Sequence, residues 1–226
     1  MVPNNFQSFI HILEKEGELH RIKTEVDPYL EITEISIKAQ LEGKPAILFE
    51  NVKGSKFPLA INTLASAKRI ELALGEDPSK IGENIINFVD SLNPPSVKSL
   101  WSNRKMIPKL LSTFPKTQRK SEVSGNFLSN PNLSDLPLLH CWPEDGGKFI
   151  TLPLVVTQHP QNDTYNIGIY RMHMYDSETT GMHMQIEKGG GFHHYQAEQM
   201  GKPLELAVAI GGDPALILSA IMPLPE

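Results

Sequence analysis

The spacing of apolar residues changes near the middle of this chain, and this change constrains the fold more than any other feature. Up to about residue 95, stretches with apolar residues three or four positions apart alternate with short continuous apolar runs. The first pattern is typical of amphipathic helices and the second of short buried strands. From residue 138 onward the apolar runs are separated by turn residues, as in antiparallel strands. The sequence therefore predicts an α+β protein that begins with an α/β domain and continues as a mainly β domain.

Capping residues mark the ends of the predicted elements in the first domain, residues 1–95. Gly17 and Gly43 follow the first two helices. The pair Asp77-Pro78 begins a third helix, because aspartate caps helix N-termini and proline suits the first turn. The predicted elements are a helix over 6–17, a strand over 21–26, a helix over 28–41, strands over 46–50 and 58–62, and a helix from 78 whose apolar stripe contains Ile81, Ile85, Phe88 and Leu92.

Two further regions follow. Residues 96–137 are basic and polar, and they predict a linking helix followed by an exposed crossing. A solvated helix packed by Trp101, Ile107 and Leu111 is favoured over one that lies on a membrane surface. Residues 138–226 predict an incomplete antiparallel barrel or sandwich, because a closed barrel needs more strands than this region offers. Its predicted elements are strands over 150–158, 165–175, 180–187 and 204–210, and helices over 191–200 and 213–220.

Composition excludes several functions. A net charge of −5 argues against a nucleic-acid surface, which needs a basic excess. No apolar run approaches the roughly 20 residues of a membrane span. The N-terminus lacks the basic start and small-residue cleavage site of a signal peptide, and the single Cys141 fits a reducing compartment. The expected location is therefore the cytoplasm.

The stretch 166–191 carries the strongest functional signal. It holds Asn166 and Arg171 in one apolar run and ends another with Lys188 and three glycines, which predicts a hairpin that cradles an anion or a metal ion. Arginine suits a bidentate bond to a carboxylate. Strict strand alternation would place Asn166 and Arg171 on opposite faces, so we expect a bulge or a strand end between them, with Gly168 as its natural place.

Other residues have competing interpretations. The repeated Met-His-Met pattern at 172–174 and 182–184, with His193 and His194, could form a soft copper(I) site, although methionines in a core and histidines in strands are the more common explanation. Cys141 could be a nucleophile but has no obvious base beyond His140. A structural turn with a buried Trp142 is favoured for this segment.

Several motifs in order resemble the UbiD family of prenylated-flavin-dependent decarboxylases, whose bacterial founder is 3-polyprenyl-4-hydroxybenzoate carboxy-lyase. The motifs are PAILFENVKG (45–54), CWPED (141–145), NIGIYR (166–171), TGMHMQIEKGGG (180–191) and AVAIGGDPALILSAIMPLPE (207–226). The resemblance implies an N-terminal α/β domain followed by the first part of a flavin-reductase-like split β-barrel. It implies a carboxy-lyase that reversibly decarboxylates a 4-hydroxybenzoate-like acid, polyprenylated or not, or an α,β-unsaturated acid.

The resemblance also assigns roles to matching residues. Asn166 would bind a divalent ion, usually manganese and with potassium as a further ion, that bridges to the flavin phosphate. Arg171 would be the catalytic arginine that positions the substrate carboxylate. Contacts with prenylated FMN would come from Ile169, Tyr170, Arg171, His183, Met184, Gln185, Lys188 and Gly189. The implied partners are a carboxylic acid substrate, a flavin prenyltransferase that supplies the cofactor, further copies of the chain, and a membrane surface if the substrate is a lipid. The implied pathway is quinone biosynthesis.

The chain departs from the family pattern at two places. Gly189 stands where some branches have a metal-binding histidine. The family's acidic metal ligand and its network glutamates follow the position of Glu226. We therefore expect a fragment of an active decarboxylase, inactive by itself. The alternatives are a flavin-binding or scaffold protein without turnover, and a Met/His metal-binding protein.

Overall fold

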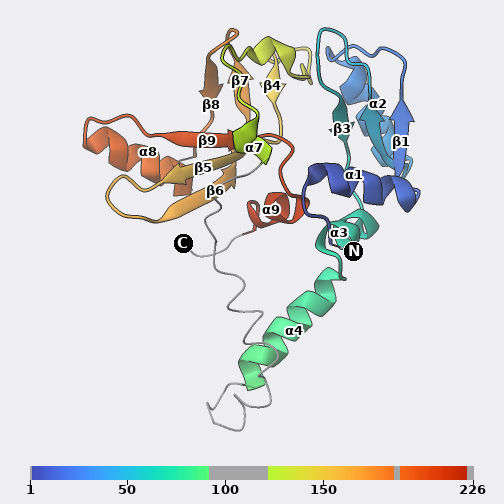
Figure 1. Cartoon of the computed structure of the whole chain (residues 1–226), viewed down its shortest axis with the longest axis horizontal. Helices are drawn as coiled ribbons and strands as arrows, with labels where there is room; N and C mark the ends of the chain where they lie inside the picture. Colours follow the sequence, from blue (N-terminus) through green and yellow to red (C-terminus); the bar gives the residue numbers. More distant parts are fainter. Residues whose placement is uncertain (1, 92–121, 186–188, 223–226) are drawn as a thin grey trace. The chain divides into compact units, whose positions relative to one another are not determined.

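The computed structural model describes residues 2–91, 122–185 and 189–222 (Figure 1). These belong to two compact units, one formed by residues 1–75 with 132–226 and the other by residues 76–131. The linking helix predicted around Trp101, Ile107 and Leu111 lies outside the described residues, as do Leu92, Lys188 and Glu226. The predicted boundaries at residues 95 and 137 stay a prediction.

The N-terminal part of the larger unit is a three-stranded sheet with helices on both faces. The strand order is β1-β2-β3, with β1 parallel and β3 antiparallel to β2. Its elements are α1 (Phe6–Lys15), β1 (Leu19–Ile22), α2 (Glu31–Leu41), β2 (Ala46–Phe49), β3 (Leu59–Ile61) and α3 (Ala67–Leu74). Asn5 caps α1 through its side chain, and Gly17 follows the helix with a positive φ of 72°, as its position in the sequence predicts.

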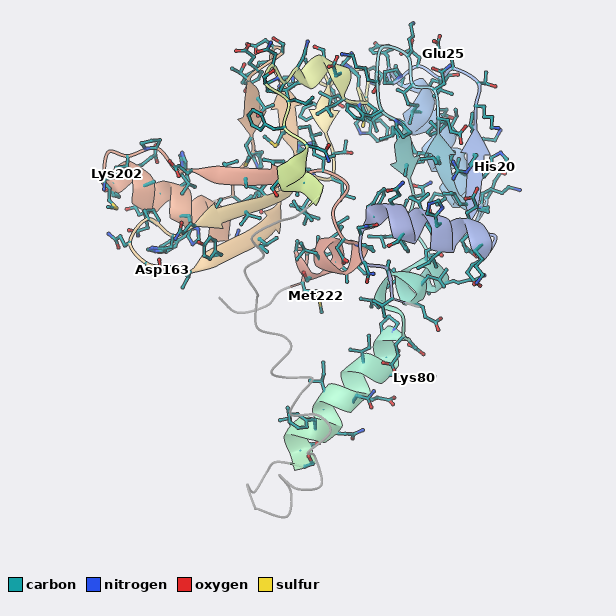
Figure 2. All side chains as sticks on the ribbon, viewed as in Figure 1. His20, Glu25, Lys80, Asp163, Lys202 and Met222 are labelled. Atoms are coloured by element: carbon teal, nitrogen blue, oxygen red, sulfur yellow. The ribbon has the colours of Figure 1, made fainter. Side chains whose placement is uncertain are left out.

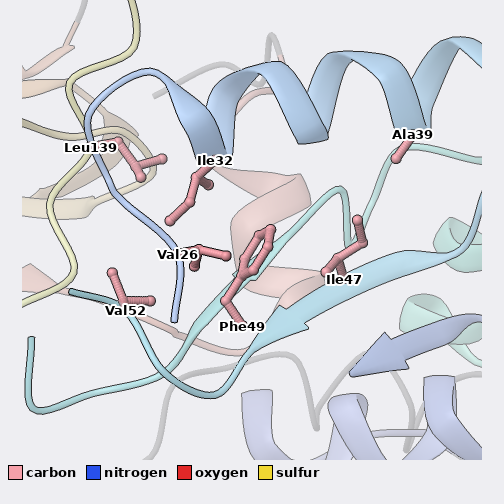
Figure 3. Packing of buried hydrophobic residues seen from close by; sticks show 7 residues of the cluster. All are labelled: Val26, Ile32, Ala39, Ile47, Phe49, Val52 and Leu139. Carbon is pink, nitrogen blue, oxygen red and sulfur yellow. The ribbon is translucent and has the colours of Figure 1, made fainter. Parts of the chain in front are cut away.

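The central strand β2 is buried along its whole length because each face of the sheet is covered. Ala46 and Leu48 pack with buried residues of α1 and α3. Ile47 and Phe49 point to the other face, where Phe49 packs below α2 (Figure 3). The cluster around Phe49 consists of Val26, Ile32, Ala39, Ile47, Phe49, Val52 and Leu139. The buried strand predicted over 46–50 is confirmed, whereas the strand predicted over 58–62 exists as β3 but is half-buried. Ile32 and Ala39 of α2 are buried against the sheet, as expected of an amphipathic helix.

Three elements in this part differ from the sequence prediction. Helix α2 begins at Glu31 and not at residue 28, because Leu30 has a φ of 63° and donates its N–H to the carbonyl of His140 at 3.0 Å. Strand β1 begins two residues and ends four residues earlier than expected, and Val26 forms a single bridge with Val52. Helix α3 was not predicted, although Ser66 caps its start and Gly75 follows its end.

The described part of the smaller unit contains α4 (Pro78–Ser91) and the short α7 (Glu122–Gly125). The predicted cap is confirmed, since Oδ1 of Asp77 accepts the N–H of Ser79 at 2.9 Å. No described residue of α4 is buried, and Ile85 is 57% exposed. The predicted apolar stripe therefore exists on the helix but is not buried among the described residues.

The C-terminal part of the larger unit contains two separate three-stranded antiparallel sheets, with orders β4-β7-β8 and β6-β5-β9. Helix α8 packs against β5 and β6, and α9 packs against α3 (Figure 1). The elements are η1 (Leu133–Asp135), β4 (Phe149–Ile150), β5 (Leu154–Gln158), β6 (Tyr165–Ile169), β7 (Met172–Met174), β8 (Thr180–Met182), α8 (Gly189–Gln199), β9 (Leu206–Ala209) and α9 (Pro214–Ser219).

The α+β class is thus confirmed, whereas the described strands close no barrel, so the split barrel stays a prediction. Asp213 caps α9 as predicted, because its Oδ1 accepts the N–H of Ala215 at 2.8 Å. Polar side chains such as Asp163, Lys202 and His20 lie on the outside of the molecule (Figure 2). Among the described residues, no helix combines the length and apolar character needed to cross a bilayer.

Candidate functional site

The run 165–175 is divided between two sheets, so the predicted hairpin over residues 166–191 forms only in its second part, where Met172–Met174 (β7) pairs with Thr180–Met182 (β8). Strand β6 pairs with β5, whereas β7 pairs with β4 and β8. The strand end that we expected between Asn166 and Arg171 exists, but it lies at Tyr170 and Arg171. Gly168 itself is a regular strand residue paired with Val155. Asn166 therefore lies in one sheet and Arg171 directly precedes β7 of the other, so alternation along one strand no longer relates them.

Asn166, Gly168 and Tyr170 are spaced two residues apart, so they lie on one side of β6 and its extension. Asn166 is half-buried and Tyr170 is 5% exposed. The ring of Tyr170 lies back over Gly168, where a Cβ atom would come within 2.6 Å of ring atom Cε2. The glycine is thus required for the close approach of the ring, and not for a bulge.

The hydroxyl of Tyr170 connects β6 with the start of α8. It accepts a hydrogen bond from Nδ2 of Asn166 at 3.2 Å and another from the backbone N–H of Gly190 at 3.0 Å. Gly190 also faces the ring, since a Cβ there would lie 2.8 Å from the hydroxyl oxygen. The structure therefore brings together Asn166, Tyr170 and the glycine segment that contains Gly189. We call Asn166, Tyr170 and Gly190 the tyrosine junction.

Arg171 and His183 lie beside each other at one end of the β7–β8 pair, Arg171 directly before β7 and His183 directly after β8. The N–H of His183 is 3.5 Å from the carbonyl oxygen of Arg171. The side chains of Arg171 and His183 are both exposed. The guanidinium carbon of Arg171 lies 5.6 Å from the centre of the Phe149 ring, a cation–π contact. The arginine is consequently accessible while its planar group is held beside an aromatic ring.

The remaining predicted site residues have different surroundings. Met184 is half-buried and Gln185 is exposed, in the segment that follows β8. Ile169 lines an apolar cavity of about 580 Å³ together with residues of α2, β3 and α9. Of the predicted site residues that the structure describes, only Ile169 lines this cavity. Lys188 lies outside the described residues.

The acidic turn between β7 and β8 is ordered by Asp176. The hydroxyl of Thr179 donates to its Oδ2 at 2.7 Å, and the N–H groups of Glu178 and Thr179 donate to its Oδ1. These bonds, with that of the Thr179 hydroxyl as the largest cause, lower the pKa of the Asp176 carboxyl. The negative charge of Asp176 is therefore stabilised by hydrogen bonds within the turn itself.

The Met-His pattern has a packing role in the described residues. Met172 is buried with Leu138 and Ile150, and the ring of His173 stacks on Phe149 at 4.7 Å between centroids. The described residues contain no group of three or more His, Cys, Asp or Glu side chains that could hold a metal ion.

Residues 141–145 form the expected turn, in which Trp142 and Asp145 exchange hydrogen bonds of 3.0 Å. The prediction that Trp142 is buried is wrong, because it is 58% exposed. No helix or strand of the described residues covers the Trp142 side chain, which borders a pocket beside α2.

Sequence reasoning missed a buried polar pair that attaches α8 to the sheet. Oγ1 of Thr157 lies 2.9 Å from Nδ1 of His193, and these residues are 1% and 2% exposed. The two are 36 positions apart in the sequence. The signal available was weak, namely a threonine at an inward position of a strand and a histidine in a helix.

Replacing Gly168 by alanine should destabilise the protein by about 1–3 kcal/mol, because the added methyl group would displace the ring of Tyr170. The free energy of unfolding in urea measures this loss. Gly82→Ala in α4 is the control, since nothing lies within 4 Å of its added Cβ and alanine is the better helix former. Equal stabilities of the Gly168 variant and the wild type would contradict the close packing of the ring.

Two family models match the chain. The 3-octaprenyl-4-hydroxybenzoate carboxy-lyase N-terminal domain matches residues 10–89, and the 3-octaprenyl-4-hydroxybenzoate carboxy-lyase Rift-related domain matches residues 115–226. The second match contains the tyrosine junction, Arg171 and His183.

Curated relatives match along nearly the whole chain. An uncharacterized protein of Chlamydia trachomatis serovar D is 44% identical over 223 residues, which cover 98% of this chain and 38% of the relative. A protein of Chlamydia pneumoniae, named as a subunit of 4-hydroxybenzoate decarboxylase, is 38% identical over 217 residues, 96% of this chain and 37% of the relative. The chain thus spans less than half of the length of these relatives.

Solved structures share the fold. Vanillic acid decarboxylase of Sedimentibacter hydroxybenzoicus in its closed form is 26% identical, with a TM-score of 0.77 over 100% of this chain and 46% of that one. An evolved dimeric form of the UbiD-class enzyme HmfF from Pelotomaculum thermopropionicum, in complex with prFMN, is 22% identical, with a TM-score of 0.69 over 99% of this chain and 52% of that one. At the second identity the likeness shows the fold alone.

Proposed function

This chain belongs to the UbiD family of carboxy-lyases, and from that membership we propose that its second half binds prenylated FMN in a decarboxylase. The observation that carries the proposal is the tyrosine junction, which joins an asparagine side chain to the glycine-rich start of α8. An amide oxygen suits a hard cation, and a helix start suits a phosphate. Arg171 follows the junction directly in the chain and is exposed to a ligand.

The residues present fit a metal-bridged flavin phosphate. Nδ2 of Asn166 is engaged by Tyr170, which makes Oδ1 the atom that would bind Mn²⁺ or a further ion such as K⁺. At the start of α8, the N–H of Gly190 is already bonded to Tyr170, so a phosphate would use neighbouring N–H groups of the first turn, beginning with Gly189. Lys188 precedes this turn in the sequence and would add a positive charge.

The side chains of the second sheet would contact the ring system and the substrate. In the proposed site Ile169, His183, Met184 and Gln185 would contact the flavin, and Arg171 would hold the substrate carboxylate in a bidentate fork. The bound prenylated flavin would supply the electrophile that takes up the electron pair left when CO₂ departs. Arg171 would orient the carboxylate toward that centre.

The proposed substrate is an aromatic acid of the 4-hydroxybenzoate type, polyprenylated or not, or an α,β-unsaturated acid. The name of the Chlamydia pneumoniae relative and the identity of the Sedimentibacter structure support an aromatic acid. We further propose a flavin prenyltransferase as the supplier of the cofactor, assembly into homo-oligomers, and a place in the cytoplasm. A lipidic substrate would add contact with a membrane surface and a role in quinone biosynthesis.

The proposal is tested on the complete gene product, co-produced with a flavin prenyltransferase and purified with Mn²⁺. We expect flavin absorbance in the wild type and Mn²⁺ binding that Asn166→Ala weakens by at least about 10-fold, since a ligand is removed. Equilibrium dialysis against Mn²⁺ in the presence of FMN measures this binding.

Asn162→Ala is the matched control, because Asn162 is exposed and its Oδ1 only caps the turn at Thr164. It should bind Mn²⁺ and flavin as the wild type does. A wild type without flavin would overturn the proposal, and so would an Asn166 variant with unchanged Mn²⁺ affinity.

A further inference from the structure

Tyr170 is buried and its hydroxyl accepts two hydrogen bonds, so it differs from the exposed tyrosines near it in the sequence. Its exposed fraction is 5%, compared with 64% for Tyr165 and 67% for Tyr175. The ring lies between Gly168 and Gly190, where added Cβ atoms would come within 2.6 Å and 2.8 Å of it. A buried ring whose hydroxyl end lies against two glycines offers little surface on which a flavin could stack.

The hydroxyl contacts the NH₂ end of the Asn166 amide. An asparagine side chain ends in an oxygen, which can bind a cation, and an NH₂ group, which cannot. Rotating the amide by half a turn exchanges the two. In the structure Nδ2 donates to the Tyr170 hydroxyl at 3.2 Å. In this orientation the NH₂ group faces the tyrosine and Oδ1 is left for a ligand.

A second hydrogen bond to the Tyr170 hydroxyl comes from the backbone of Gly190. The N–H of Gly190 can only donate, so the Tyr170 oxygen must act as an acceptor at 3.0 Å. The hydroxyl is held in place by the backbone at the start of α8, and it in turn accepts from the amide. The position of the glycine-rich segment is thereby coupled to the orientation of a side chain on β6.

From these contacts we propose that Tyr170 is a positioning residue, which presents Oδ1 of Asn166 to the metal ion and ties it to the start of α8. The inference rests on the proposed role of Asn166 as a metal ligand. It assigns Tyr170 a role through Asn166 and Gly190 in place of direct contact with the flavin.

The test compares Tyr170→Phe with Tyr165→Phe in the complete gene product. The phenylalanine ring still fills the space between Gly168 and Gly190, and circular dichroism checks that the fold is kept. Tyr170→Phe should weaken Mn²⁺ binding about 10-fold at a fixed FMN concentration, as is usual when a partner of a metal ligand is removed. Tyr165→Phe, an exposed tyrosine of the same strand, should leave it unchanged.

Asn166→Asp provides a second background that separates positioning from general stability. A carboxylate has an oxygen at both ends, so its orientation no longer matters. We expect Tyr170→Phe to change the Mn²⁺ affinity of the Asn166→Asp protein by less than about 3-fold, against about 10-fold in the wild type. A purely structural tyrosine would cause the same loss in both backgrounds.

The outcomes separate the two proposals. If Asn166→Ala weakens Mn²⁺ binding while Tyr170→Phe does not, or if the loss is equal in both backgrounds, the positioning role is overturned and the metal site stands. If Asn166→Ala itself leaves Mn²⁺ binding unchanged, the proposed function fails. A loss confined to the asparagine background supports the role of Tyr170.

Discussion

Replacing Arg171 by alanine in the complete gene product should lower the rate of CO₂ release by at least about 10²–10³-fold. The exposed guanidinium is the cation that the proposed site offers to a substrate carboxylate, and its removal leaves that carboxylate unoriented. The contact of Arg171 with Phe149 is at the surface, so the fold should be kept. Turnover of an aromatic acid, followed by CO₂ release, measures the effect, and circular dichroism checks the fold.

Two variants sharpen this experiment. Arg171→Lys keeps the charge but loses the planar fork, so its rate should lie between those of the wild type and the alanine variant. Arg21→Ala is the control, because Arg21 only forms ion pairs with Glu14 and Glu50 at the surface of the N-terminal sheet. Retained turnover in Arg171→Ala would refute the proposed role of the arginine.

Replacing Phe49 by alanine should lower the free energy of unfolding by about 3–5 kcal/mol. Phe49 is 0% exposed and fills the space between β2 and α2 (Figure 3), so the substitution leaves a cavity in the core. Urea denaturation followed by circular dichroism measures the change.

Phe57→Ala is the matched control, because Phe57 belongs to the same part of the chain but is 46% exposed. Its effect should stay within about 0.5 kcal/mol. A loss below about 1 kcal/mol for Phe49→Ala would show that the cluster below α2 does not stabilise the fold as the structure indicates.

Much of the N-terminal part could be predicted because its signals are local. The run Ala46–Phe49 is continuously apolar, as a strand covered on both faces must be. Helix caps at Asp77 and Asp213 use a side chain and N–H groups two or three residues away, so they can be read from the sequence directly. Leu30 is the exception, since its bond to His140 depends on a segment far along the chain.

The candidate site could be predicted only as a list of residues. The motifs indicated Asn166, Tyr170 and Arg171 together, and a single strand was the simplest arrangement for them. The structure divides that strand after Ile169, because residues on its two sides pair with different neighbours. The contact between Tyr170 and Gly190 spans 20 positions, and no periodicity in the sequence reports it.

The sequence alone determined the class of the fold, the family and the residue types available to a ligand, because these follow from local periodicity, caps and ordered motifs. Only the tertiary structure decided how these residues meet. It placed Asn166 in one sheet and Arg171 directly before a strand of the other, packed Tyr170 against two glycines, and left Arg171 exposed beside Phe149. The physical reason is that strand pairing and side-chain packing join segments far apart in the chain, and their free energy depends on all partners together.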